Sequence, residues 1–218
     1  MDIHERLISY TESEELANRI THGLATLVSL PAVVVLIVAA ARTGDPFRVV
    51  SCTVFGVSVT AFFLVSTLSH PVRRPKARYV FRILDHAFIY LVIAGTYTPF
   101  TLVLLRPAKG WWLFGIVWFL AVAGIIFKAF ATHRLRFLAP ALYIVLGWLV
   151  VVDLESLLTL VSPEGVKLLV AGGLAYTFGI IFYAIDKIPF NHAAWHLFVI
   201  AGSTLHYFAV LRAVVPLN

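Results

Sequence analysis

The chain has 218 residues, of which 61% are hydrophobic and only 13% are charged. Soluble globular domains typically carry about 25% charged residues, so this composition excludes a soluble domain and indicates a multi-pass membrane protein. The net charge of +6 does not indicate a nucleic-acid partner, because the Lys and Arg residues lie in short segments between apolar runs, as in loops that set membrane orientation. Cys52 is the only cysteine, which excludes an intrachain disulfide and a cysteine-based zinc site.

The first 21 residues lack the features of a secretory signal. They carry five acidic residues and two arginines, whereas a signal peptide begins with a positively charged segment. The first apolar run, 22–41, is also longer than the roughly 7–15 residues of a signal-peptide core. We therefore expect this run to stay in the protein as a membrane helix.

Seven apolar runs follow one another, each long enough for a helix that crosses a bilayer with modest tilt. They cover residues 22–41, 49–69, 84–105, 111–131, 137–154, 166–185 and 192–211. The fifth run is the least regular, because Asp153 and Glu155 interrupt it near its end. The connections are short and hold turn-forming Gly and Pro residues. The sequence predicts one domain over residues 1–218, an all-α bundle of seven transmembrane helices.

The Lys and Arg residues are divided unequally between the two ends of this predicted bundle. Eleven of the 17 lie on the side that holds the N-terminal segment 1–21 and the loops 70–83 and 128–136. Short loops rich in Lys and Arg stay in the cytoplasm. We therefore expect the N-terminus to be cytoplasmic and the C-terminus to lie outside.

A helix start signal precedes the first apolar run. Thr11 and Glu14 have the spacing of a capping box. Glu15, Asn18 and His22 follow at spacings of three and four residues, which places them on one helix face. The pattern fits an amphipathic helix leading into the membrane as well as a face that contributes to a site, so the roles of these three residues stay open.

The last apolar run opens with two histidines four residues apart, His192 and His196, and contains a third, His206. On a helix, residues four apart lie on one face about 6 Å apart along the axis, so these two imidazoles can bind one metal ion. Ionisable residues inside a membrane segment are usually tied to a function. His206 lies about 15 Å beyond His196, too far to bind the same ion. We interpret it as an interior hydrogen-bonding residue that could face a substrate cavity.

The predicted topology brings polar residues of four runs to one level near the cytoplasmic face. These residues are His22, Ser66, His70, Asp85, His86, His192 and His196. Three neutral imidazoles are a typical ligand set for catalytic zinc, with the fourth position left for water. We therefore predict that His70, His192 and His196 bind Zn²⁺. Asp85 would then support the water or accept its proton, and Ser66 would orient the water or donate to a developing oxyanion.

Each of these signals also has a plainer interpretation. A single histidine such as His70 inside a membrane bundle is more often a hydrogen-bonded interior residue than a ligand. A His-x-x-x-His spacing alone is weak support for a metal, and Asp85 could simply pair with Arg82. His86 is rotated about 100° from Asp85 on a helix and is expected to face elsewhere. The shared depth of the signals is what favours a site.

Four stretches of the chain resemble a known family. They are EELANRITHG (14–23), SVTAFFLVSTLSH (58–70), LDHAFIYLVIAGTYTPF (84–100) and NHAAWHLFVIAGSTLHY (191–207). Together they resemble the hemolysin III-type bacterial membrane proteins within the progestin and adipoQ receptor family. The resemblance implies seven helices in the bacterial inner membrane with a cytoplasmic N-terminus. It also implies zinc held by three histidines that match His70, His192 and His196, with an aspartate and a serine that match Asp85 and Ser66.

The wider superfamily includes alkaline ceramidases and suspected lipid hydrolases. The resemblance therefore implies zinc-dependent hydrolysis of a lipid amide or ester, with membrane lipids as partners. Two other functions stay open. One is a non-enzymatic regulator of membrane lipid or energetic state in which zinc ties helices together. The other is a pore-forming hemolysin, which the largely apolar outer halves of the runs disfavour.

Overall fold

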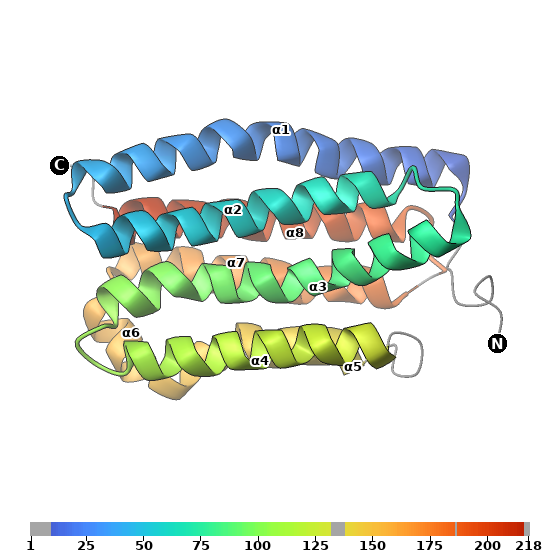
Figure 1. The fold of residues 1–218 in the computed structure, drawn as a ribbon. Coiled ribbons are helices and arrows are strands. Elements are labelled where there is room, and N and C mark those ends of the chain that lie inside the picture. Colours follow the sequence, from blue (N-terminus) through green and yellow to red (C-terminus); the bar gives the residue numbers. More distant parts are fainter. Residues whose placement is uncertain (1–9, 132–137, 186, 216–218) are drawn as a thin grey trace.

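The computed structural model describes residues 10–131, 138–185 and 187–215. Within these ranges the protein is all-α, and seven segments are long and apolar enough to cross a membrane. The elements are α1 (Glu12–Arg42), α2 (Pro46–Ser69), α3 (Pro75–Pro99), η2 (Phe100–Leu104), α4 (Gly110–Ala131), α5 (Leu138–Gly147), η3 (Leu149–Asp153), α6 (Leu154–Leu160), α7 (Pro163–Ala184), α8 (Asn191–Ala209) and η4 (Val210–Val214). They form one bundle of roughly parallel and antiparallel helices (Figure 1). The predicted multi-pass helical membrane protein is confirmed.

Successive spans run in opposite directions, so their ends gather at two faces of the bundle. The starts of α1, α3 and α8 and the end of α2 lie together at the right of Figure 1. We call this end, which holds Glu12, Ser69, Pro75 and Asn191, the site face. The segments predicted to share one level do so. The cytoplasmic location of this face stays a prediction.

α1 begins ten residues before the first predicted run and is continuous to Arg42. Its N-cap is Thr11, whose side chain accepts from the Glu14 amide while the Glu14 side chain accepts from the Thr11 amide. The predicted capping box is therefore confirmed. A helix of 31 residues is about 46 Å long, more than the roughly 30 Å of a hydrocarbon core. Its first turn carries Glu12, Glu14 and Glu15, so this end suits a position outside the core.

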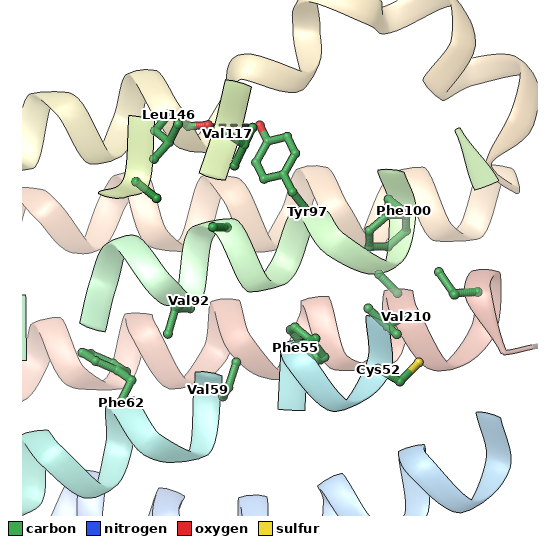
Figure 2. Close-up of a cluster of buried hydrophobic side chains, with 14 of the residues drawn as sticks. Cys52, Phe55, Val59, Phe62, Val92, Tyr97, Phe100, Val117, Leu146 and Val210 are labelled. Atoms are coloured by element: carbon green, nitrogen blue, oxygen red, sulfur yellow. Dashed lines mark hydrogen bonds between the residues drawn. The ribbon is translucent and has the colours of Figure 1, made fainter. Parts of the chain in front are cut away.

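The fifth span is broken, which differs from the continuous predicted run 137–154. α5 ends at Gly147, a 3-10 segment follows to Asp153, and α6 continues to Leu160. The Tyr97 hydroxyl donates to the carbonyl oxygen of Leu146 (Figure 2). It also donates to the carbonyl oxygen of Gly147 and accepts from the amide of Val150. A break inside a membrane span is tolerated where the freed backbone groups find such partners. Residues 132–137, with Arg134, Arg136 and the predicted start of this run, lie outside the described residues.

The core lies between α2, α3 and α8, and α3 belongs to the most buried of the seven spans. It contains Cys52, Phe55, Val59 and Phe62 of α2, Val92 of α3, Phe100 of η2 and Val210 of η4 (Figure 2). By contrast, α1 exposes apolar side chains such as Leu27 and Val28, which are 66% and 69% exposed. Exposed apolar side chains in a continuous helix suit contact with lipid. Hence α1 lies at the edge of the bundle and α3 at its centre.

Candidate metal centre

Three histidines meet inside the site face. His70, His192 and His196 each offer one ring nitrogen, and these atoms lie within 4.8 Å of one another. His70 is the C-cap of α2, while the other two lie one turn apart at the start of α8. His196 has no exposed surface and His192 is 7% exposed. The cluster could hold one metal ion, as predicted from the spacing of His192 and His196 and from the level of His70 in the bundle.

The hydrogen bonds of two of these rings leave their inner nitrogens free. Nδ1 of His70 lies 2.8 Å from Oε2 of Glu15, and Nδ1 of His196 lies 3.0 Å from the Thr21 hydroxyl. Nε2 of both rings is buried and has no hydrogen-bond partner among the described residues. A histidine that binds a metal usually has its other nitrogen fixed by such a carboxylate or hydroxyl. The residues therefore fit a metal held through Nε2 of His70 and His196, with His192 as the third imidazole.

Glu15 connects three helices at this cluster. Its Oε2 accepts from His70 of α2, and its Oε1 pairs with Arg78 of α3. The Glu15 side chain is 17% exposed. Its role, left open by the sequence, is to orient the His70 ring while Arg78 holds its carboxylate. Glu15 and Thr21 lie in a stretch that carries the family resemblance, but nothing in the sequence indicated that they, or Arg78, contact the histidines.

Asp85 and Ser66 provide oxygen atoms beside the histidines. Asp85 is 5% exposed and lines a cavity of about 60 Å³ together with His70 and His192. The Ser66 hydroxyl lies beside this carboxyl group. Oγ of Ser66 and Oδ1 of Asp85 are nevertheless buried without a hydrogen-bond partner in the described part of the chain. These two oxygens are therefore available to a water or a substrate.

Lys128 is an unexpected neighbour of this site. The sequence placed it in a basic loop, but it lies near the end of α4 and is only 6% exposed. Lys128 and Arg82 are among the positive charges that act on Asp85. Opposite charges nearby reduce the cost of burying a carboxylate. The sequence could not show that Lys128 is buried, because a lysine at a helix end has the same sequence context whether it faces solvent or a neighbouring helix.

His22 and Asn18 face the cluster rather than solvent. The His22 ring stacks on His196, with centroids 3.5 Å apart and an interplanar angle of 12°. Both residues have no exposed surface. Across residues 10–131, 138–185 and 187–215, no hydrogen-bond partner reaches either ring nitrogen of His22 or either polar side-chain atom of Asn18. The polar face of α1 therefore belongs to the interior of the site.

His86 lies closer to the site than predicted. It lines the same cavity as Asp85, although the rotation about α3 suggested that it faces elsewhere. Its Nδ1 donates to the Arg82 carbonyl at 2.8 Å, and its Nε2 lies 2.9 Å from the Tyr183 hydroxyl. The prediction failed because the cavity is wide enough to be bordered by two adjacent positions of one helix. His86 therefore lines the cavity but does not belong to the cluster of three histidines.

A second cavity, of about 100 Å³, lies deeper in the bundle between α3, α5, α7 and α8. Trp195 borders it, and the Trp195 ring centroid is 5.1 Å from His192 and 5.4 Å from His196. His206 borders the same cavity and hydrogen-bonds the Leu169 carbonyl at 3.1 Å. The prediction that His206 is an interior hydrogen-bonding residue is confirmed. The apolar cavity thus begins beside the three clustered histidines.

Residues 10–207 match the family described as Haemolysin-III related. The chain is 48% identical over 203 residues to Hemolysin-3 of Bacillus cereus, covering 93% of each chain. It is 46% identical over 202 residues to the Hemolysin-3 homolog of Bacillus subtilis (strain 168), covering 93% of this chain and 95% of that one. It is also 29% identical over 212 residues to the human Monocyte to macrophage differentiation factor, covering 91% and 84% of the two chains. The resemblance seen in four sequence stretches is thereby confirmed, and the chain belongs to the haemolysin-III related family.

Proposed function

We propose that this protein is a zinc-dependent hydrolase that cleaves a lipid amide or ester near the cytoplasmic face of the bacterial inner membrane. The observation that carries the proposal is the buried cluster of His70, His192 and His196, with the unpartnered oxygens of Asp85 and Ser66 beside it. Buried polar atoms without partners are costly and rare in folded proteins. A metal ion and a water among these atoms would remove that cost.

The donor set suits zinc in a catalytic arrangement. Three imidazoles are a common ligand set for catalytic zinc and leave one position open. When bound there, zinc supplies a Lewis acid that activates water for attack on a carbonyl group. Other divalent ions also bind imidazole, so the metal has to be identified by elemental analysis.

Side chains of this protein supply proton transfer, stabilisation of the carbonyl oxygen and orientation of the histidine rings. Asp85 accepts a proton from the attacking water and returns it to the leaving amine or alcohol, so that one water is consumed and charge is balanced. Ser66 donates its hydroxyl hydrogen to the carbonyl oxygen as negative charge develops there. Glu15 and Thr21 hold the rings of His70 and His196 in place.

The apolar cavity supports a lipid as the substrate. It adjoins the histidines at Trp195 and extends into the membrane-spanning part of the bundle. Gly147 of α5 borders it, and a Cβ at this position would meet open space. Gly147 is also exposed, so we place the entry of the apolar chain from the bilayer at this position. The carbonyl group could then lie at the site while the chain stays in apolar surroundings.

The variant Asp85→Asn tests the assignment of a general base. It keeps the size of the side chain and all three histidines, so we expect zinc content like that of the wild type. Turnover of a bacterial lipid extract, measured as released fatty acid, is expected to fall at least about 100-fold, because proton transfer contributes roughly 10²–10⁴ in rate.

Asp153→Asn is the matched control, because Asp153 is also 5% exposed but lies in η3, and it pairs there with Lys109. This control should retain turnover. Undiminished release by Asp85→Asn would contradict the proposed role of Asp85.

A structural role for the metal is the second candidate, because the site already ties four spans together. Glu15 of α1 joins His70 of α2 to Arg78 of α3, and His196 of α8 contacts Thr21 of α1. In a non-enzymatic regulator of the membrane, metal removal would lower thermal stability in the wild type and in Asp85→Asn alike. No lipid extract would then yield zinc-dependent products.

A pore finds little support in the arrangement of the core. The bacterial relatives carry the name Hemolysin-3. The end of this bundle opposite the site face is filled by Phe55, Phe100, Leu105 and Val210, none more than 4% exposed. Steady, dose-dependent leakage of liposomes carrying the purified protein would support a pore instead of a hydrolase.

A further inference from the structure

The apolar cavity extends along a large part of α8. Along α8 it extends from Trp195 to His206, eleven residues that correspond to about 16 Å. Its volume of about 100 Å³ exceeds the roughly 10–15 Å³ that one water needs. A volume of this size spread over such a length suits an unbranched chain better than a fused ring system.

Several hydrogen-bonding side chains in the cavity wall already have partners. The Tyr97 hydroxyl is held by the backbone around the break in α5. The Tyr176 hydroxyl lies 2.7 Å from that of Ser203, and the Trp148 indole donates to the Thr177 hydroxyl at 3.0 Å. Each of these groups therefore already has a hydrogen-bond partner inside the bundle.

His206 differs from these residues. Its Nε2 lies 3.1 Å from the carbonyl oxygen of Leu169. A carbonyl can only accept, so Nε2 carries the hydrogen and the lone pair of the uncharged ring is on Nδ1. Nδ1 is buried and has no hydrogen-bond partner in the ranges that the structure describes. The cavity therefore borders a residue with one unused hydrogen-bond acceptor.

The packing around His206 fixes the ring in this orientation. A Cβ on Gly172 of α7 would lie 2.3 Å from Cδ2 and 2.5 Å from Nε2 of His206. The ring therefore rests directly on the backbone of α7, and only glycine leaves room for it. Tyr176, with its ring centroid 5.4 Å away, covers another side. A ring held in this way keeps its acceptor in one place.

We propose that this cavity binds a lipid chain that carries a hydroxyl group, and that this hydroxyl donates to Nδ1 of His206. A bound water explains the acceptor less well, because a buried water needs two to four polar partners and much of the wall's hydrogen-bonding capacity is already used. A chain hydroxyl needs one partner only, since apolar wall holds the rest of the chain. This proposal names the class of lipid that the hydrolase would act on. It rests on the proposed function only for the position of the reactive carbonyl group. The preference for a hydroxyl group is a property of binding and does not require turnover.

The test compares fatty acids that differ by one hydroxyl group. Stearic acid and hydroxystearic acids with the hydroxyl at successive positions are titrated into delipidated protein, with the fluorescence of Trp148 and Trp195 as the readout, since both line the cavity. One positional isomer should bind about tenfold more tightly than stearic acid, the value expected for one hydrogen bond to a buried acceptor. Equal affinity of the wild type for stearic acid and for every isomer would overturn the proposal.

Two variants test whether His206 causes the preference for a hydroxyl group. His206→Phe keeps a ring but removes the acceptor, so stearic acid should bind within about twofold of wild type while the tenfold preference disappears. Thr96→Val is the matched control, because the Thr96 hydroxyl lines the same cavity but already donates to the Val92 carbonyl. It should keep the preference. A preference that survives in His206→Phe would contradict the assignment.

The outcomes separate this inference from the proposed function. A hydroxyl preference in a protein that hydrolyses no lipid would support the cavity assignment and contradict the hydrolase. Zinc-dependent lipid hydrolysis without any hydroxyl preference would support the hydrolase and contradict the cavity assignment. If His206→Phe does not fold, the wild-type comparison of positional isomers still decides the matter.

Discussion

The His70 ring is held on its outer side by a carboxylate that is itself held by an arginine. Glu15 accepts from Nδ1 of His70, and Arg78 pairs with the other oxygen of the same carboxyl group. Such a partner fixes the orientation and tautomer of a metal-binding ring and raises its basicity. At the residue scale, the affinity of the site should therefore depend on residues that never touch the metal.

Glu15→Gln tests this dependence. The amide keeps the size of the side chain but loses the charge that favours a strongly bound His70 ring, so we expect zinc affinity to fall about 10- to 100-fold. The measurement is competition with a chelator of known affinity, on purified protein in detergent.

Glu12→Gln is the control for this variant. Glu12 lies one turn earlier on α1, and its side chain is 96% exposed where it faces Arg73. An exposed pair of this kind contributes little, so zinc affinity should not change. Equal affinities for Glu15→Gln and the wild type would show that the carboxylate does not support the ligand.

The sequence predicted which three histidines form the cluster, but it did not predict the residues that hold their rings in place. His192 and His196 could be predicted from a spacing of four, and His70 from its place at the end of a run on the same side. Thr21 contacts a residue 175 positions away, and no local pattern encodes such a contact. Arg78 was one of several basic residues in a loop. Supports of this kind depend on tertiary packing, which a single sequence does not reveal.

At the scale of one element, the fifth span shows how a membrane helix can break at low cost. Tyr97 of α3 reaches across to Leu146, Gly147 and Val150, so one hydroxyl serves three backbone groups at the break. The sequence indicated an interruption through Asp153 and Glu155. It could not show that the break begins near Gly147, because the compensating tyrosine lies about 50 residues away in the chain.

Tyr97→Phe tests the role of this hydroxyl. The variant leaves the three backbone groups without their partner, and we expect a loss of about 1–3 kcal/mol in the free energy of unfolding. Tyr207→Phe is the comparison, since it removes one hydrogen bond, to the Ala32 carbonyl at 3.1 Å, and should cost about 1 kcal/mol. Thermal unfolding in detergent measures both. A smaller loss for Tyr97→Phe than for Tyr207→Phe would contradict this account.

At the scale of the whole molecule, charge is distributed along the axis of the bundle. The site face holds the basic segment 70–83, and the opposite face holds fewer Lys and Arg residues. Such a bias sets orientation during insertion. The seven spans could be predicted because long apolar runs have few other interpretations. Their boundaries shifted where Thr11, Pro46 and Pro75 start helices before the apolar residues begin.

Cysteine labelling tests the orientation. Lys76 near the site face and Ala108 at the opposite face are both exposed, and the native Cys52 has no exposed surface. In intact cells, a membrane-impermeant maleimide should label Ala108→Cys, and should label Lys76→Cys only after the membrane is permeabilised. The unaltered chain, with Cys52 alone, gives the background. Labelling of Lys76→Cys in intact cells would reverse the proposed orientation.

The most direct test of the central claim is the metal content of the purified protein. Elemental analysis should find about one zinc per chain in the wild type, as expected for a three-histidine site, and none in the double variant His192→Ala/His196→Ala. His206→Phe, which changes a histidine outside the cluster, should keep its zinc, and circular dichroism should show the same helix content in all three proteins. A wild type that binds no divalent metal, or a double variant that keeps it, would contradict the assignment of these histidines as a metal centre.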